Sequence, residues 1–418
     1  MRFIIIILFV VVFISGMLYF FTSLQDKTIK IGLLYSKTGT MSKEEQVLSQ
    51  VLHYQVEKIN QEGGLLHKYV EIVEYDGASN EKEFAKGAEF LINKGVETIF
   101  GAWTSASRKA IKPIIERENA LLFYPVQYEG IEESENIIYL GSVPNQQIRS
   151  SVSYIKNNFG KKIYIVGSDS IYPRINHIYI QEFSKLIGMD LLGASHVPLG
   201  TKSFKEVVQK IAILKPDVII NTLNASANSA FFNELKQQKI DAKQIRVFST
   251  SIDEVSLKYM GDTLGTQALN GHYIMGSYFN SIDNIENVKI RKNYEKRYGK
   301  DFILTDVGFN VHMAFEFYKR AVINIGSVEA EKLLREIHND TLESAAGILC
   351  LDDNNHLHKK VRISKIQNNR LDIVWESEYS IQPKPFPSFK NKQFWEKEQN
   401  RLYENWDESW QSNGGGAL

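Results

Sequence analysis

Three short segments combine aromatic rings with small polar residues where a predicted strand ends. The first is residues 100–109, in which Trp103 can wall a pocket and Thr104 or Ser105 can cap the helix that follows. The free N–H groups of that helix's first turn suit a carbonyl or carboxylate oxygen. The alternative is an ordinary capped helix after a strand.

The second segment, residues 123–130, also follows a predicted strand. It places Tyr124, Val126 and Gln127 around a proline, which makes the loop stiff and gives it several hydrogen-bonding groups. Such a loop can line a binding site. It can equally be a packed turn.

The third segment, residues 167–174, ends a strand in the second half of the chain. Ser170 and Tyr172 offer hydroxyl groups there, and the alternative is that Asp169 merely caps the next helix. Asn224, at the end of a further strand, is a weaker addition. Because ligands of open α/β sheets sit beyond the carboxyl ends of the strands, all three segments are candidate binding loops.

Motifs of the common catalytic and metal sites are missing from the sequence. It has no phosphate-binding loop, no HExxH, no GxSxG and only one cysteine, Cys350, which excludes an internal disulfide and a cysteine-based zinc site. His312 and Glu316 lie one helical turn apart but are best explained as flanks of an amphipathic helix face. We therefore expect neither enzymatic activity nor a cofactor or metal.

Bulk composition restricts the partners. Lys and Arg number 49, as do Asp and Glu, so the formal net charge is zero, whereas a nucleic-acid-binding protein usually carries a basic face. With 43% hydrophobic residues, the chain of 418 residues can form more than one core.

Residues 1–24 are expected to be a membrane segment. An almost unbroken apolar run extends from Phe3 to Leu18, about the length needed to cross a bilayer. Good cleavage sites are lacking, which favours an uncleaved anchor over a cleaved signal, and no cysteine follows for lipid attachment. Either reading places the remaining chain in the periplasm or at the outer face of the cytoplasmic membrane.

Downstream, β-rich runs alternate with helical stretches, and this rhythm restarts near residue 162. Such alternation predicts an α/β protein with two doubly wound parallel-sheet lobes and a ligand cleft between them. We assign residues 28–148 plus about 276–345 to the first lobe, and 149–275 plus about 346–385 to the second. Residues 346–351 and 359–366 are expected to pair as a hairpin around a polar turn, and 386–418 to form a surface-packed tail containing a short helix.

Several ordered blocks of sequence carry a family resemblance. They are residues 36–41, 59–64, 75–79, 103–110, 124–125, 128–130, 144–147, 221–224 and 278–283. With these blocks the chain resembles type I periplasmic-binding proteins, and within them the urea and short-chain amide branch. The resemblance spans about residues 29–387 and implies a two-lobed receptor that closes on urea or a small amide.

The resemblance also implies roles for single residues. Trp103 would stack on the ligand and Ser105 would bond its carbonyl oxygen, with Tyr124 and the Val126–Gln127 backbone lining the first lobe and Tyr172 closing from the second. Ser170 stands where relatives often have Tyr, which leaves room for a ligand larger than urea. Val126 and Gln127 depart from the amide-sensor members and look more like the urea-transport members.

The leading interpretation is therefore an extracytoplasmic substrate-binding protein whose partners are the permease subunits of an ABC transporter. The alternative is a receptor that senses urea or an amide and regulates a partner protein. A third class, an amide hydrolase, lacks a visible nucleophile, base or metal set.

Overall fold

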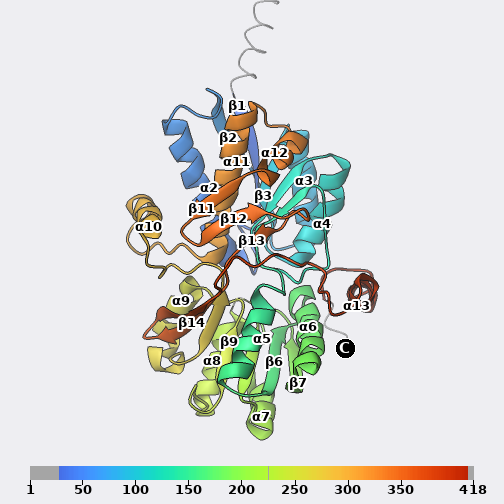
Figure 1. The fold of residues 1–418 in the computed structure, drawn as a ribbon, viewed down its shortest axis with the longest axis vertical. Helices are drawn as coiled ribbons and strands as arrows, with labels where there is room; N and C mark the ends of the chain where they lie inside the picture. Colours follow the sequence, from blue (N-terminus) through green and yellow to red (C-terminus); the bar gives the residue numbers. More distant parts are fainter. Residues whose placement is uncertain (1–27, 225, 413–418) are drawn as a thin grey trace, which may run out of the picture.

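The computed structural model describes residues 28–224 and 226–412, which form two lobes stacked along the long axis of the molecule (Figure 1). The expected N-terminal anchor lies outside these residues. Within the described ranges, every helix is either too short or too polar to span a bilayer.

Lobe 1 is built on a five-stranded parallel sheet in the order β2-β1-β3-β4-β5. Its strands are β1 (Thr28–Tyr35), β2 (Tyr69–Asp76), β3 (Thr98–Gly101), β4 (Leu121–Tyr124) and β5 (Ile137–Tyr139). Its helices are α2 (Ser42–Gln61), α3 (Glu81–Asn93), α4 (Ser105–Arg117), α10 (Ile285–Tyr298), α11 (Asp306–Ile325) and α12 (Ala330–His338). Every side chain of β3 and β4 is buried, as in parallel strands covered on both faces.

Lobe 2 contains a seven-stranded sheet in the order β15-β14-β10-β9-β8-β6-β7. The parallel strands are β6 (Lys162–Ser168), β7 (Asp190–Val197), β8 (Val218–Thr222), β9 (Arg246–Ser249) and β10 (Tyr273–Gly276), and β14 (Arg362–Gln367) and β15 (Arg370–Glu376) run antiparallel. The helices are α5 (Gln147–Asn158), α6 (Ile171–Ile187), α7 (Lys205–Leu214), α8 (Ala227–Gln237) and α9 (Glu254–Leu264). The predicted α/β class with two parallel-stranded lobes is confirmed.

The chain crosses between the lobes three times, at residues 140–146, 277–284 and 359–361. Side chains tie these crossings together: the hydroxyls of Ser142 and Ser277 are 2.7 Å apart, and Lys359 Nζ donates to the Leu140 carbonyl oxygen. The linked crossings form a common hinge. The side chains at the strand ends that face the opposite lobe are not used in this hinge and can line a cavity between the lobes.

The third crossing lies later in the chain than the sequence analysis placed it. A small antiparallel sheet of β11 (Thr341–Ser344), β12 (Gly347–Leu351) and β13 (Leu357–His358) packs Leu349 and Leu351 into the core of lobe 1. Residues 346–358 thus lie with lobe 1, although they were assigned to lobe 2. The polar turn is where it was expected, but β12 pairs with β13, and β14 pairs with β10 and β15 instead.

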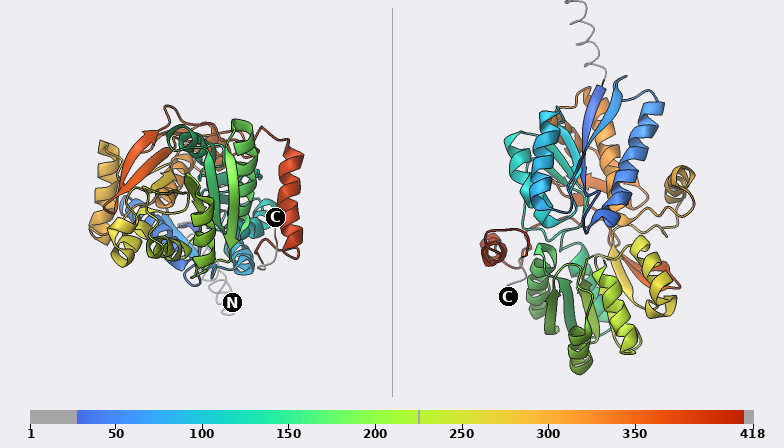
Figure 2. Two further views of the ribbon diagram at one scale, coloured as in Figure 1. Left: turned by 90° about the horizontal axis from the view of Figure 1, so that it is seen from below. Right: turned by 180° about the vertical axis from the view of Figure 1, so that it is seen from behind.

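The C-terminal segment is more deeply packed than a surface tail. Helix α13 (Lys392–Asn405) lies at one side of the molecule, near the seam between the lobes and beside α6 (Figure 2). Trp395 and Trp406 are 0% and 1% exposed and belong to the core of lobe 2. Spacing alone gave no indication that these tryptophans fill a core, because the surrounding residues are mostly charged.

Candidate ligand-binding site

A cavity of about 320 Å³ lies between the lobes, beyond the carboxyl ends of strands from both sheets. Both lobes contribute loops and helix N-termini to its walls, as expected for ligand sites in such sheets. All of the sequence-predicted site residues line this one cavity: Trp103, Ser105, Tyr124, Val126, Gln127, Ser170, Tyr172 and Asn224.

The turn from β3 into α4 brings Trp103 to the cavity through an unusual backbone. A side chain at Gly101 would place its Cβ 2.7 Å from the Leu34 carbonyl oxygen, so the strand can pass there only without one. The next residue, Ala102, has φ +63°, a left-handed conformation that is costly for a residue with a Cβ. Tyr124 then donates its hydroxyl proton to the Trp103 carbonyl oxygen at 2.7 Å and fixes the turn.

The first turn of α4 presents hydrogen-bond donors to the cavity. Thr104 is the N-cap, and its hydroxyl oxygen accepts from the Ser107 N–H at 3.0 Å. Within the described part of the chain, the N–H groups of Ser105 and Ala106 have no acceptor. Since both residues line the cavity, these two amides are available to an oxygen atom of a ligand.

The Ser105 hydroxyl, which was expected to donate to a ligand carbonyl oxygen, donates its proton to a protein carboxylate instead. It donates to Glu129 Oε2 at 2.5 Å and receives Arg108 Nη1 at 3.3 Å. Its proton is therefore not free for a ligand carbonyl. What the oxygen retains is acceptor capacity, which suits an N–H of a ligand.

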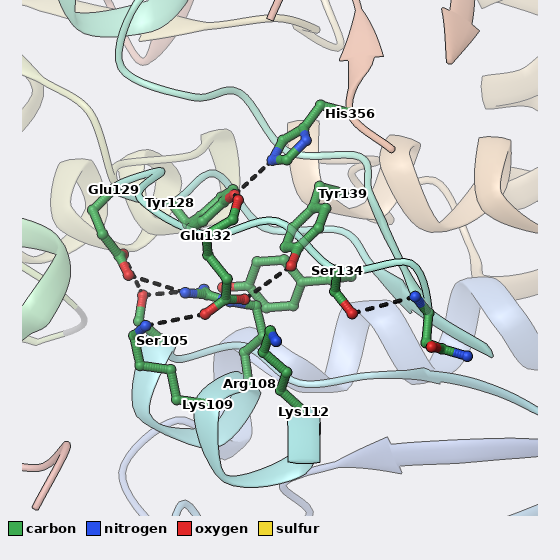
Figure 3. Close-up of polar contacts among 12 residues, drawn as sticks. Ser105, Arg108, Lys109, Lys112, Tyr128, Glu129, Glu132, Ser134, Tyr139 and His356 are labelled. Carbon is green, nitrogen blue, oxygen red and sulfur yellow. Dashed lines mark hydrogen bonds and ion pairs between the residues drawn. The ribbon is translucent and has the colours of Figure 1, made fainter. Parts of the chain in front are cut away.

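A buried ionic network joins α4 to the loop that carries Glu129 and Glu132 (Figure 3). Arg108 is fully buried, with Nη2 2.9 Å from Glu129 and Nε 2.8 Å from Glu132, while Lys109 Nζ lies 3.0 Å from Glu132. Tyr139 also donates to Glu132 at 3.0 Å. Burial disfavours the ionised Glu132 carboxyl, but Arg108 and Lys109 outweigh burial and hold its pKa well below the ordinary value.

No local sequence pattern predicts this network, because Arg108 and Lys109 lie on α4 whereas Glu129 and Glu132 follow β4. Its two cations and two carboxylates cancel formally, so little positive charge remains for a ligand. The order of the predicted strands could have revealed the network. Helix α4 follows β3, and Glu129 and Glu132 follow β4, the next strand of the parallel sheet. Adjacent parallel strands place the segments that follow them side by side.

Lobe 2 contributes the opposite wall through the start of α6. Ser170 is the N-cap of that helix without a side-chain capping bond, and Tyr172 donates to Gln147 Oε1 at 3.3 Å. Asp169 does not cap the helix. It accepts from Arg174 Nε at 2.6 Å, and both side chains are largely buried.

Two of the predicted residues, Gln127 and Asn224, hold the cavity wall in place by hydrogen bonds to other parts of the protein. Gln127 Nε2 donates to the Thr250 carbonyl oxygen at 3.2 Å and so bridges the lobes. The Asn224 N–H donates to Ser168 Oγ at 3.0 Å, which holds that strand end next to β6.

Part of the cavity wall was not predicted from the sequence as site material. It consists of residues of the turns after β1 and β2, of the loop after β7, of Ser251 and of the C-terminal end: Thr40, Met41, Ser79, Glu81, Pro198, Leu199, Ser251, Trp410, Gln411 and Ser412. The blocks 36–41 and 75–79 had been noted for their family resemblance. Nothing in the sequence pointed to the C-terminal residues.

Replacing Ser105 by alanine should weaken ligand binding and lower the free energy of unfolding by about 1–3 kcal/mol, because a buried carboxylate oxygen of Glu129 loses its donor. The protein should still fold. Titration calorimetry and urea denaturation measure the two effects. Ser107→Ala is the matched control, since Ser107 is buried on the same helix but does not line the cavity; equal ligand affinity in Ser105→Ala and the wild type would contradict the assignment.

Glu45, in the first turn of α2, is expected to make stability fall as pH rises. Burial raises the pKa of this carboxyl to about 8, although the Ser36 N–H donates to it at 2.6 Å and favours ionisation. The ordinary value is 4.5, so the folded state binds more protons than the unfolded state between these limits. Stability from this group is therefore greatest below pH 4.5 and is lost towards pH 8.

The Glu45→Gln variant should unfold with a free energy at least about 1 kcal/mol above that of the wild type at pH 8, and close to it at pH 5. Denaturant titrations across this range measure the difference. Exposed Glu62, the C-cap of the same helix, provides the control Glu62→Gln, which should follow the wild-type curve. A Glu45→Gln curve parallel to that of the wild type would show that Glu45 is ionised in the folded protein.

Comparison with known families identifies what the two-lobed arrangement resembles. A profile described as a periplasmic binding protein domain matches residues 29–392, which is most of the chain. The match includes both lobes and all eight of the predicted cavity residues.

Solved structures share the fold at low sequence identity. A solute-binding protein of an ABC transporter from Rhodopseudomonas palustris, in complex with 3,4-dihydroxybenzoic acid, superposes with a TM-score of 0.76, is 18% identical, and the match covers 85% of this chain and 98% of that chain. A branched-chain amino acid transporter substrate-binding protein from Streptococcus pneumoniae, with isoleucine, gives 0.73 at 15% identity over 83% and 99%. At these identities the likeness concerns the fold.

A curated relative is similar over a shorter stretch. Limonene hydroxylase from Geobacillus stearothermophilus is 33% identical over 123 residues, which is 29% of this chain. The chain matches only 23% of the length of that relative.

Proposed function

Because the chain belongs to the periplasmic binding protein family, we propose that it binds urea or a short-chain amide in the interlobe cavity and delivers it to the permease of an ABC transporter. The observation that carries the choice of ligand is the charge of the cavity wall. We further propose that the N-terminal segment holds the protein at the outer face of the cytoplasmic membrane.

The cavity wall favours a neutral ligand over an anion. Of the described residues that line it, none is Lys or Arg, and Glu81 and Asp169 are acidic. The buried Arg108 is already paired with Glu129 and Glu132. A carboxylate would lose its hydration there without gaining a cationic partner, which is strongly unfavourable. The carboxylate ligands named for the structural relatives are therefore poor candidates here.

The polar groups at the start of α4 match both ends of an amide. We expect the ligand carbonyl oxygen to accept from the Ser105 and Ala106 N–H groups, and a ligand N–H to donate to Ser105 Oγ. The rings of Trp103, Tyr124 and Tyr172 then exclude water, which strengthens these hydrogen bonds.

Cavity size favours a short-chain amide over urea itself. With about 30 Å³ for each liquid water, 320 Å³ has room for roughly ten waters. Urea is much smaller, and a ceiling of about 1.5 kcal/mol per heavy atom limits its binding free energy to about 6 kcal/mol. An added alkyl group can fill the space beside the aromatic rings and gain apolar burial.

A thermal-shift screen of the purified protein tests the proposal. Urea, formamide, acetamide, propionamide, butyramide and benzamide are compared with benzoate and branched-chain amino acids, since a ligand that binds the folded state raises the melting temperature. We expect the rise to be largest for one of the amides and negligible for benzoate. A rise with benzoate or an amino acid and none with any amide would refute the proposed ligand class.

A further inference from the structure

The last described residues, 406–412, are outside the part of the chain that matches the family profile, yet three of them, Trp410, Gln411 and Ser412, line the ligand cavity. We propose that this segment, which we term the C-terminal strap, is an additional wall of the ligand site that limits ligand size through Trp410 and must move aside for ligands to exchange. This inference rests on the proposed function as a small-molecule receptor.

The strap starts from a firm anchor on lobe 2. Trp406, at its first residue, is 1% exposed and packs in the core of that lobe together with Trp395 of α13. Trp395 Nε1 donates to the Pro387 carbonyl oxygen at 2.9 Å, and its ring lies 6.1 Å from that of Tyr179 on α6. This end of the strap is therefore held on lobe 2.

Beyond Trp406 the strap has contacts with both lobes. On lobe 1, Ser409 Oγ donates to Glu81 Oε1 at 3.3 Å, and Lys109 Nζ lies 4.5 Å from the centre of the Trp410 ring. On lobe 2, Ser412 Oγ donates to Asp169 Oδ2 at 2.6 Å. Glu81 and Asp169 both line the cavity, so the strap crosses its rim from one lobe to the other.

The Trp410 ring is held in place between neighbours. It packs on Tyr403 of α13 with ring centres 4.5 Å apart, and Lys109 Nζ of α4 lies over the same ring. Lys109 also donates to Gln399 Oε1 of α13 at 3.1 Å, which ties the anchor helix to lobe 1. A bulky ring fixed at the rim restricts the volume available to a ligand. The bonds from Ser409 to Glu81 and from Ser412 to Asp169 come from residues outside α13, so breaking them leaves the hydrogen bonds of the helix intact.

Accessibility of the cavity floor tests the strap without any ligand. Ala106 lines the same cavity as Trp410, so an Ala106→Cys substitution in a Cys350→Ser background places one thiol on the cavity wall. Its rate of reaction with a small methanethiosulfonate reagent should rise roughly tenfold when Trp410→Ala is added, equivalent to about 1.4 kcal/mol. Trp410→Phe should give a smaller rise, and Tyr379→Ala, which removes an aromatic ring that is 72% exposed, should give none.

Ligand range provides the second readout. Trp410→Ala should shift the ratio of benzamide to acetamide affinity about tenfold towards benzamide. An unchanged thiol reaction rate together with an unchanged affinity ratio would overturn the role of the strap. If the wild-type protein binds no amide, the proposed ligand class fails, and the thiol rates still decide whether the strap covers the cavity.

Discussion

The Arg108→Met variant is expected to lose about 3–5 kcal/mol of unfolding free energy, the largest stability effect of any single substitution considered for this protein. Methionine preserves much of the side-chain volume but removes both hydrogen bonds to Glu129 and Glu132. Those two carboxylates are 0% and 6% exposed, so each loses a partner that water cannot replace. Lys109 still contacts Glu132, which limits but does not abolish the loss.

Arg108 also lies over aromatic rings, with its guanidinium carbon 4.2 Å from the centre of the Tyr128 ring and 4.9 Å from that of Tyr124. Tyr124 fixes the Trp103 carbonyl, so loss of Arg108 should disturb the cavity as well as the core. Denaturant unfolding measures stability, and titration calorimetry measures ligand affinity. Adding Glu129→Gln to Arg108→Met should recover part of the lost stability, because Glu129 is the carboxylate left without a cation, whereas Glu132 keeps its contact with Lys109.

Arg335→Met is the matched control. Its partner is Glu331, and these side chains are 73% and 70% exposed, so this pair should contribute less than about 1 kcal/mol. A similarly small effect for Arg108→Met would mean that the buried network does not hold α4 in place.

The Trp103→Ala variant is expected to bind ligand with at least about 2 kcal/mol less free energy, a loss of roughly 30-fold in affinity. Trp103 is a large ring on the cavity wall, and its removal admits water next to the donors of α4. The turn itself is held by the bond from the Ala102 N–H to the Leu34 carbonyl oxygen at 3.0 Å and by the bond from Tyr124 to the Trp103 carbonyl, both of which survive the substitution. The protein should therefore remain folded.

Calorimetric titration with the best amide of the thermal-shift screen measures this loss. Trp103→Phe should retain much of the affinity, because a smaller ring still excludes water. Tyr69→Ala removes a ring that is 63% exposed and does not line the cavity, so it should leave affinity unchanged. Wild-type affinity in Trp103→Ala would place the ligand elsewhere.

Residues at the ends of predicted strands could be assembled into a site from the sequence alone. The strand-to-helix openings at Trp103–Ser105 and Ser170–Tyr172 carry recognisable residue types, and a doubly wound sheet places all such openings on one edge. For the same reason Tyr124, Val126 and Gln127, which follow the next strand, line the same cavity. The sheet topology therefore determines where most of the cavity residues lie.

Pairings set by tertiary packing were beyond the reach of the sequence. The direction of the Ser105 hydroxyl bond depends on Glu129, which follows a different strand, and no local pattern reveals that partner. The short strand β13 is only Leu357–His358, so the expected partner for β12 was taken from the longer run that follows. Trp410 reaches the cavity because α13 docks beside α6, a contact between segments more than 200 residues apart.

Titration of the full chain with an isosteric pair, butyramide and butyrate, tests the central claim most directly. The two ligands have nearly the same shape and differ in charge, so they isolate the effect of a wall without free cations. We predict saturable binding of butyramide and none of butyrate at the same concentrations near pH 7. Binding of butyrate with no binding of butyramide would contradict the account, because it would require a positive charge in the cavity that the paired Arg108 cannot supply.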